Sequence, residues 1–216
     1  MKQFHGLSIP SALDELCEPR RTALLVYDMQ VGICSQIREG ARVVERCAVA
    51  LAAARHAGMR VVFTRHLSCP KNWMGTTQLR SAMAWQRTVD PEAVKPWFLR
   101  GAATFEIVPD LRPSADELIL DKLSMSAFEG TPLSYVLKDC DILGVAIVGI
   151  ALEIGIEPTV RHATDLGFVP IVLADACGIG NAEAGARSLN TMRFVGEAIL
   201  SEVDSFSRLL EAPGSG

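Results

Sequence analysis

Strand-like apolar runs alternate with amphipathic helical segments along most of the chain, and this alternation constrains the fold most strongly. The runs typical of buried strands are residues 22–27, 60–64, 117–121, 142–149 and 168–174, with 197–200 a weaker candidate. Helical spacing of apolar residues is found at 41–57, 131–138, 157–166, 182–191 and 204–210. Strands separated by helices form βαβ units. We therefore predict an α/β fold with a mostly parallel sheet of about six strands, covered by helices on both faces.

Composition excludes several classes of protein. Hydrophobic residues make up 49% and charged residues 21% of the 216 residues, which is typical of a globular chain rather than a disordered one. The formal net charge of −4 argues against a nucleic-acid partner. No apolar run approaches the length of a membrane span, and the N-terminus lacks the pattern of a signal peptide. We therefore expect a cytoplasmic protein with no membrane partner.

The domain organisation that we predict is simple. Residues 1–21 form an N-terminal arm, 22–211 a single domain, and 212–216 a disordered tail. Within the domain, residues 67–116 break the alternation and form an aromatic-rich insertion that contains every tryptophan of the chain. Long loops in compact domains are usually lids or binding loops. A pocket wall and a subunit interface are equally good interpretations of these rings.

Polar residues follow several of the predicted strands directly. Asp28 follows the first, His66 the second and Lys122 the third, while residues 149–155 follow the central strand and Asp175 the next. Ligands of parallel α/β sheets bind beyond the carboxyl ends of the strands. These residues are thus expected to converge at one edge of the sheet.

Three ordered motifs carry a resemblance to a known family. They are Asp28 with Met29 and Gln30, the segment 121–128 (DKLSMSAF), and the segment 149–159 (GIALEIGIEPT). From about residue 22 to 210, the chain resembles the isochorismatase-like (cysteine hydrolase) superfamily, which includes nicotinamidases, carbamoylsarcosine and biuret amidases, and isochorismatases. The resemblance implies one Rossmann-like, three-layer α/β/α domain, assembled as a homodimer or homotetramer, that hydrolyses a small molecule.

The same resemblance assigns the catalytic positions. The family's Asp matches Asp28 and its Lys matches Lys122, but the position of its nucleophilic Cys is occupied by Gly155. Without a side chain, no covalent thio-intermediate can form at that position. The isochorismatase branch also has glycine there, yet it typically has Tyr where this chain has Ala151. We therefore expect hydrolysis of a partly apolar or aromatic molecule by Asp28-dependent acid/base catalysis, without a cysteine intermediate.

Further roles follow from the resemblance. Lys122 would stabilise negative charge or bind a carboxylate or carbonyl of the substrate. The family has a non-proline cis peptide at the position of Ile150–Ala151, and the amide groups of residues 151 and 155 would form an oxyanion hole. The residues that we expect to line the substrate site are Ile33, Cys34, His66, Trp73, Trp85, Trp97, Phe128 and Glu153.

Cysteines and metals complete the predictions. The six cysteines contain no CxxC pair and are expected to be free thiols. Cys34 is a conceivable substitute nucleophile, although a plain core or pocket thiol is the simpler interpretation, and Cys177 is a weaker case of the same kind. The nicotinamidases' Asp-x-His metal pair is absent around His66, and His162 suits a packing or surface role. We predict no metal and no cofactor.

Two alternatives to cysteine-free hydrolysis stay open at this point. The chain is a catalytically degenerate binding or assembly protein, in which Asp28 and Lys122 are only a structural ion pair, or it is a C–N (amide) hydrolase that uses a relocated thiol such as Cys34.

Overall fold

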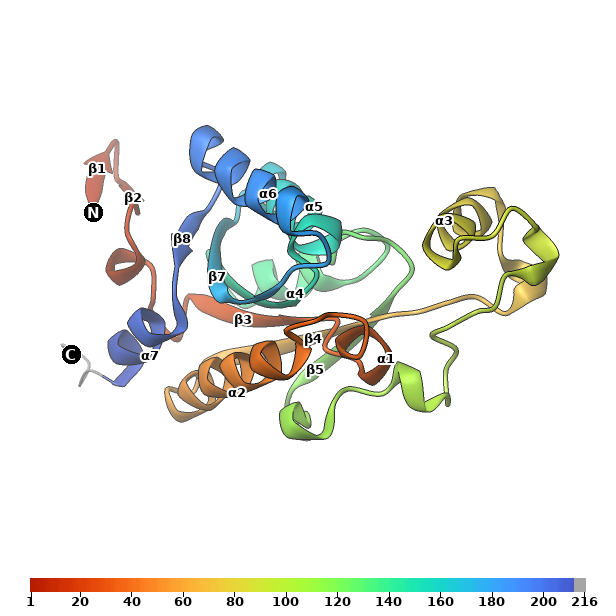
Figure 1. The fold of residues 1–216 in the computed structure, drawn as a ribbon. Helices are drawn as coiled ribbons and strands as arrows, with labels where there is room; N and C mark the ends of the chain where they lie inside the picture. Colours follow the sequence, from red (N-terminus) through yellow and green to blue (C-terminus); the bar gives the residue numbers. More distant parts are fainter. Residues whose placement is uncertain (212–216) are drawn as a thin grey trace.

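The computed structural model describes residues 1–211, and its centre is a six-stranded sheet in which every pair of neighbours is parallel (Figure 1). The strands are ordered β5-β4-β3-β6-β7-β8. Their bounds are β3 Thr22–Tyr27, β4 Arg60–His66, β5 Leu118–Lys122, β6 Gly144–Ile150, β7 Val169–Gly178 and β8 Ile199–Ser201. This confirms the predicted α/β fold with about six mostly parallel strands.

Helices cover both faces of the sheet, which gives the predicted three layers (Figure 1). On one face lie α2 (Gly40–His56) and α7 (Val203–Glu211). The opposite face is covered by α4 (Leu133–Asp139), α5 (Glu157–Asp165) and α6 (Ala182–Val195). A short helix, α1 (Val31–Cys34), follows β3 and escaped prediction because one turn is too short to show a helical period.

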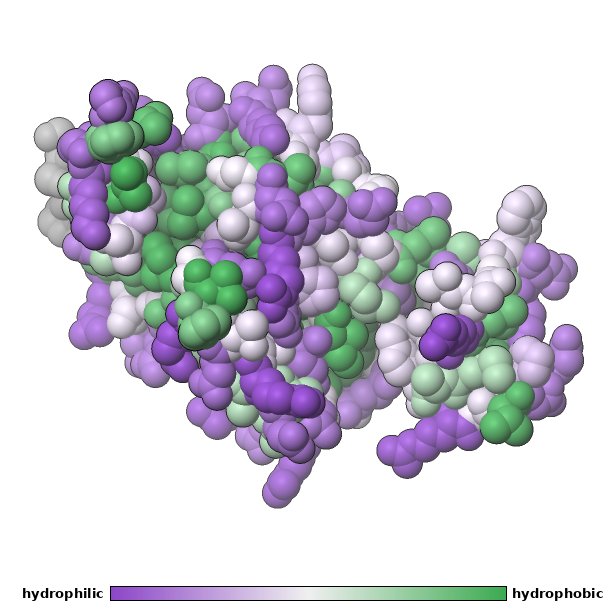
Figure 2. Space-filling view, turned by 90° about the horizontal axis from the view of Figure 1, so that it is seen from above, coloured by the Kyte–Doolittle hydropathy of each residue, from purple (hydrophilic) through white to green (hydrophobic). Residues whose placement is uncertain are grey.

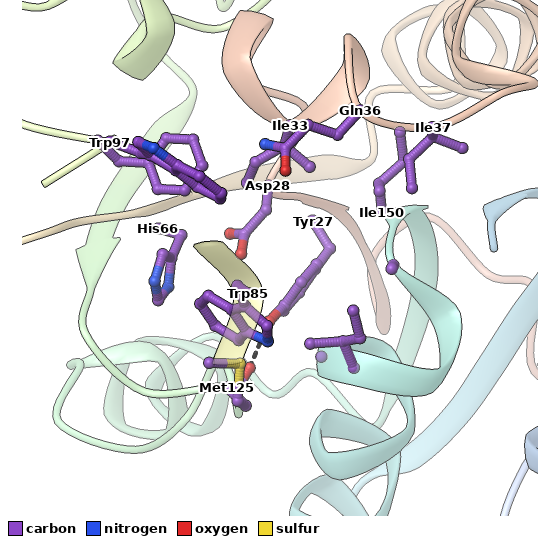
Figure 3. Close-up of a pocket in the computed structure, with 14 residues that line it drawn as sticks. Tyr27, Asp28, Ile33, Gln36, Ile37, His66, Trp85, Trp97, Met125 and Ile150 are labelled. Atoms are coloured by element: carbon purple, nitrogen blue, oxygen red, sulfur yellow. Dashed lines mark hydrogen bonds between the residues drawn. The ribbon is translucent and has the colours of Figure 1, made fainter. Parts of the chain in front are cut away.

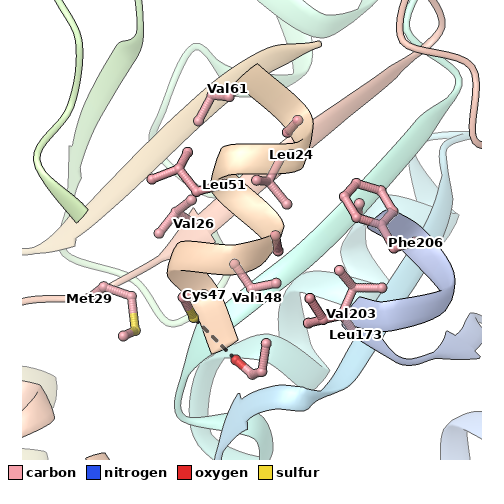
Figure 4. Close-up of a cluster of buried hydrophobic side chains, with 14 of the residues drawn as sticks. Leu24, Val26, Met29, Cys47, Leu51, Val61, Val148, Leu173, Val203 and Phe206 are labelled. Carbon is pink, nitrogen blue, oxygen red and sulfur yellow. Dashed lines mark hydrogen bonds between the residues drawn. The ribbon is translucent and has the colours of Figure 1, made fainter. Parts of the chain in front are cut away.

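Alternation along β3 divides its side chains between two cores. Leu24 and Val26 pack under α2 with Leu51, close to Phe206 of α7 (Figure 4). The intervening residues, and Tyr27 at the end of the strand, face the layer of α4, α5 and α6. This is the side-chain period of two that every strand has. It directs Tyr27 towards the segment that joins β6 to α5.

The insertion between β4 and β5 contains a helix that the sequence did not reveal. Helix α3 (Thr76–Gln86) is accompanied by 3-10 turns η2 Lys71–Trp73, η3 Pro91–Ala93, η4 Ala103–Phe105 and η5 Pro109–Leu111. We call residues 67–98 the α3 lobe; it stands to one side of the sheet (Figures 1 and 2). Its own small core is formed by Met74, Ala82 and Val94. Only Ala82 of α3 is buried, so the helix lacks the strong apolar stripe that predicts helices.

The predicted N-terminal arm contains a small antiparallel hairpin of β1 (Lys2–Phe4) and β2 (Leu7–Ile9). The tail predicted at 212–216 lies outside the described residues, and the predicted domain bounds at 22 and 211 remain predictions. Within residues 1–211, none of the helices combines the length and apolar character that crossing a bilayer requires.

Candidate active site

A pocket of about 240 Å³ opens at the carboxyl ends of β3 and β6. The chain runs outward from β3 to β4 and β5 on one side and from β6 to β7 and β8 on the other, so the strand order reverses here. Such a reversal is where open α/β sheets form their ligand sites. The lining residues, most of them labelled in Figure 3, are Tyr27, Asp28, Ile33, Gln36, Ile37, His66, Trp85, Trp97, Phe98, Met125, Ile150, Ala151, Ile154 and Gly155.

Asp28 lies at the floor of this pocket and is only 3% exposed. Its φ of 49° is left-handed, a conformation that Asp adopts more readily than most residues. The residue directly follows β3, and its side chain is aimed into the pocket. Oδ1 accepts a hydrogen bond from Thr64 Oγ1 at 2.7 Å, and Oδ2 accepts one from Lys122 Nζ at 2.7 Å. The carboxylate is thus fixed to the adjacent strand β4 through Thr64 and to β5, the strand beyond it, through Lys122.

Lys122, at the end of β5, is a buried cation with a complete set of acceptors. Its ammonium donates to Asp28 Oδ2, to the Tyr27 hydroxyl at 2.9 Å and to the Ser124 carbonyl at 3.2 Å. An ammonium group has three N–H donors, so all of them are engaged. The structure therefore favours a role of Lys122 in holding Asp28 and Tyr27 and supplying positive charge, rather than in direct capture of a substrate carboxylate.

Tyr27 is a site residue that sequence reasoning missed, because it reads simply as the last apolar residue of a buried strand. Its hydroxyl accepts from Lys122 and donates to the main-chain carbonyl of Met125 (Figure 3). Burial, reinforced by the nearby Asp28 charge, raises the pKa of this phenol well above its ordinary value. The alternation along β3 was the available signal, since it points Tyr27 at the β6–α5 segment.

Gly155 lines the pocket directly beside Tyr27. A Cβ at residue 155 would lie 2.6 Å from the Cε1 atom of Tyr27 and closer still to its hydroxyl oxygen. The position that the family resemblance assigns to the nucleophile therefore has no room for any side chain. The tyrosine hydroxyl occupies that space instead.

The peptide bond between Ile150 and Ala151 is cis, as the resemblance implied, and both residues line the pocket. The π-helical turn η6 (Leu152–Ile156) follows directly. Within it, the Gly155 N–H donates to the Ala151 carbonyl at 3.0 Å, and the Ile156 N–H donates to the same oxygen at 3.1 Å. We expected the amides of residues 151 and 155 to form an oxyanion hole. The Gly155 amide is already bonded within the turn, so that half of the prediction is wrong.

Four of the predicted substrate-site residues form walls of the pocket: Ile33, His66, Trp85 and Trp97. The His66 ring packs edge-on against Trp85 and Phe98, at centroid distances of 6.3 and 5.8 Å. Burial lowers the pKa of His66, and the Lys122 charge adds to this while the Asp28 charge opposes it. His66 is therefore a neutral, aromatic part of the wall.

Two other predicted residues point away from the pocket. Trp73 is 80% exposed and lines no part of the pocket, because it ends the 3-10 turn η2, in which no residue is buried. Cys34 is buried in the core beneath α2 rather than in the pocket wall, since consecutive residues of α1 face different directions and Ile33 takes the pocket side.

Phe128 and Glu153 were also placed wrongly. Phe128 stacks on Phe168 at 5.5 Å in the core of the α4–α6 face. Glu153 Oε1 accepts hydrogen bonds from the N–H groups of Gly180, at 2.8 Å, and Asn181, at 2.7 Å. The carboxylate thus secures the turn before α6, which explains its direction away from the pocket.

Several lining residues besides Tyr27 went unnoticed in the sequence. Ile37 lies in the turn between α1 and α2, where no helical or strand period marks its direction. Phe98 belongs to the aromatic insertion, but Gln36, Met125 and Ile154 carry no pattern that marks a pocket. Within residues 1–211, all six cysteines are free thiols, and no cluster of three or more His, Cys, Asp or Glu side chains is arranged to hold a metal ion.

Comparison with known proteins agrees with this architecture. The isochorismatase domain model matches residues 22–203. The chain belongs to the isochorismatase family. It is therefore a hydrolase of that family, as predicted, and its curated relatives include ureidoacrylate amidohydrolases RutB. The one from Serratia proteamaculans is 29% identical over 96% of this chain and 90% of its own, and the one from Klebsiella pneumoniae is 28% identical over 94% and 93%.

Solved structures share the fold. A cysteine hydrolase from Pseudomonas syringae pv. phaseolicola superposes with a TM-score of 0.74 at 24% identity, covering 90% of this chain and 94% of its own. An isochorismatase family protein from Desulfovibrio vulgaris gives a TM-score of 0.75 at 22% identity, covering 88% and 98%.

Proposed function

We propose that this isochorismatase-family hydrolase cleaves a small, partly apolar or aromatic molecule by acid/base catalysis at Asp28, with no covalent cysteine intermediate. The observation that carries the proposal is the pairing of a buried Asp28–Lys122 ion pair with a pocket whose lining contains no thiol. Lys122 holds the Asp28 carboxylate in place. A water molecule beside this carboxylate would lose its proton to Asp28 as it attacks the substrate.

A relocated cysteine nucleophile has little support. Cys34 does not line the pocket, and burial raises the pKa of its thiol to about 11, which disfavours the reactive thiolate. Cys177 is more deeply buried, and its pKa is also raised by burial. Neither sulfur has the electropositive, accessible surroundings that activate a catalytic cysteine.

The walls of the pocket support the substrate class. Trp85, Trp97 and Phe98 supply flat apolar surface on one side, and Ile33 and Ile37 supply it on another. Aromatic and aliphatic walls around a few polar groups are typical of sites for small organic molecules. Since relatives are named ureidoacrylate amidohydrolases, a C–N bond is the first bond to test, with the vinyl ether of isochorismate-like compounds as the second candidate.

The test is turnover of a panel of ureido acids, aromatic amides and vinyl ethers by the wild-type protein, Asp28→Asn and Cys34→Ser. We expect Asp28→Asn to lower kcat by about 10²–10⁴-fold, because it keeps the shape of the side chain and removes the proton acceptor. Cys34→Ser should stay within a few-fold of wild type. Undiminished turnover in Asp28→Asn would leave Asp28 and Lys122 as a structural ion pair, and a loss above about a hundredfold in folded Cys34→Ser would favour the relocated thiol.

A further inference from the structure

The space that a side chain at residue 155 would fill is taken by a phenol, and this points to a function for Tyr27. We propose that Tyr27 is a catalytic residue whose hydroxyl donates a proton to the leaving group of the substrate, with Lys122 relaying the replacement proton from Asp28. The inference rests on the proposed function, in which Asp28 accepts a proton from water.

The first support is the way the backbone makes room for the ring. Tyr27 pairs with Gly149 across β3 and β6, and a Cβ on Gly149 would collide with the Tyr27 backbone. At Gly155 a Cβ would overlap the phenol itself. Glycines at both positions therefore let Tyr27 lie close against the β6–α5 connection. Its hydroxyl comes to the place from which a side chain at residue 155 would face the substrate.

The second support is the polar chain that ends at this hydroxyl. Lys122 Nζ lies 2.7 Å from Asp28 Oδ2 and 2.9 Å from the Tyr27 oxygen, so one ammonium group contacts both. The phenolic hydrogen is directed to the Met125 carbonyl, which also belongs to the pocket wall. Rotation of the hydroxyl about its C–O bond would turn that hydrogen away from Met125 and towards a substrate in the pocket, which Tyr27 lines. Tyr27 and Asp28 both line the pocket, whereas Lys122 lies behind them.

The third support is the protonation state that these contacts impose. Burial and the neighbouring Asp28 charge raise the pKa of Tyr27, so the phenol keeps its proton at neutral pH and is a hydrogen donor rather than a nucleophile. Phenolate formed by donation would lie beside the Lys122 ammonium, whose positive charge stabilises it while it lasts.

The proton balance closes without an outside reagent. Water attacks the substrate and gives one proton to the Asp28 carboxylate, while the bond to the leaving group breaks and that group takes the Tyr27 proton. Lys122 then passes a proton to the phenolate and receives the one held by Asp28. The net change is the addition of water across the cleaved bond, with Asp28, Lys122 and Tyr27 returned to their starting forms.

A graded series of aryl acetates, from 4-nitrophenyl acetate to phenyl acetate, tests this role. Proton donation matters little when the leaving group is a stable anion such as 4-nitrophenolate and matters more as the leaving group becomes basic. Tyr27→Phe keeps the ring and removes the hydroxyl. We expect its kcat to fall less than about tenfold on 4-nitrophenyl acetate and about a hundredfold or more on phenyl acetate. Tyr135→Phe, at the exposed second tyrosine of the chain, is the matched control and should leave the whole series unchanged.

Asp28→Asn, measured on the same series, separates the two proposals. If Asp28→Asn is inactive and Tyr27→Phe loses the same factor on every ester, or nothing, the role of Tyr27 is overturned and the proposed function stands. If wild type and Asp28→Asn do not differ on any ester or on any compound of the panel given above, the proposed function fails, and the role of Tyr27 fails with it. A loss in Tyr27→Phe that grows as the leaving group worsens supports proton donation, because a purely structural role has no reason to follow leaving-group basicity.

A second pair of variants covers the case in which Tyr27→Phe does not fold. Gly155→Ala should displace the phenol and lower both the denaturation midpoint and the activity on phenyl acetate. Adding Tyr27→Val to Gly155→Ala removes the ring that the new Cβ would meet, so the double variant should lose less stability than the sum of the two single variants, while the activity on phenyl acetate stays low. Gly155→Ala with wild-type midpoint and activity would contradict the packing on which the inference depends.

Discussion

Two walls of the same pocket are held in different ways. The wall made by the strand ends contains Tyr27, Asp28 and Ala151, all at most 7% exposed and attached to parallel strands. The opposite wall is carried by the α3 lobe, where Trp85 is 43% exposed and the supporting core is small. Segments with few buried apolar contacts open more easily than the core of a domain. The comparison suggests that the strand-end wall holds the chemistry in fixed geometry, whereas the lobe wall adapts to the substrate.

The largest effect is expected at the strand-end wall, from Lys122→Met. This variant keeps most of the volume but leaves a buried carboxylate and a phenol without their shared donor. Loss of one partner of a buried ion pair costs about 3–5 kcal/mol of unfolding free energy, and loss of the positive charge should lower kcat by about 10²–10³-fold.

Chemical denaturation and turnover, with exposed Lys2→Met as control, measure the effects of Lys122→Met. If Lys122→Met had wild-type stability and turnover, the strand-end wall would tolerate substitution as well as the lobe wall does.

A pair of core truncations compares the two regions directly. Phe206→Ala empties a fully buried site between α7 and the sheet and should cost about 3–5 kcal/mol of global unfolding free energy. Met74→Ala should change that quantity by less than about 1 kcal/mol, because the small core of the lobe can open locally without unfolding the sheet.

Urea denaturation followed by circular dichroism gives both free energies, and hydrogen exchange locates the change to α3 in Met74→Ala. Equal global losses in the two variants would show that the lobe and the sheet unfold as one unit.

The same contrast explains what the sequence could predict. The strands could be predicted from apolar runs, because parallel strands are buried on both faces. Asp28 could be predicted because it directly follows such a run, and ligands bind beyond the carboxyl ends of parallel strands. The roles of Lys122, the cis bond and the missing nucleophile at Gly155 came from the family resemblance. Tyr27 escaped notice because its importance depends on a glycine 128 positions later in the chain, a pairing that only the fold brings together.

The wrong predictions concern the α3 lobe and the directions in which individual side chains point. The sequence shows that all three tryptophans lie in one insertion, but it does not show which of the rings face the pocket. Trp73 was therefore grouped with Trp85 and Trp97. Helix α3 lacks a buried stripe, which hides it from periodicity. Cys34, Phe128 and Glu153 lie close to pocket residues in sequence, yet the local helix and turn geometry directs them to the core or to the N–H groups before α6.

An intermediate effect is expected from the rings of the lobe wall. Trp85→Ala and Trp97→Ala each remove flat apolar surface from the pocket, and at least one should weaken binding of benzamide, a planar probe, by about 1–3 kcal/mol. Trp73→Ala is the matched control because this ring lines no part of the pocket.

Saturable quenching of tryptophan fluorescence measures the affinity for benzamide. If none of the three variants changes binding while all of them shift the sedimentation coefficient, the lobe serves as a subunit interface and the inference of an aromatic substrate should be abandoned.

The smallest effect is expected on the pH dependence of stability, through a histidine at which the two walls meet. His66 ends β4 but packs against Trp85 of the lobe, and burial lowers its pKa below the ordinary value near 6.5. As the pH falls through about 6.5, the unfolded chain binds a proton at this residue before the folded protein does, so the free energy of unfolding decreases progressively down to the folded-state pKa. His66→Gln removes this titration and should flatten that part of the pH profile, whereas exposed His5→Gln should not. Thermal midpoints between pH 7.5 and about 5 provide the measurement, and identical slopes in His66→Gln and wild type would show that His66 is not held neutral between the walls.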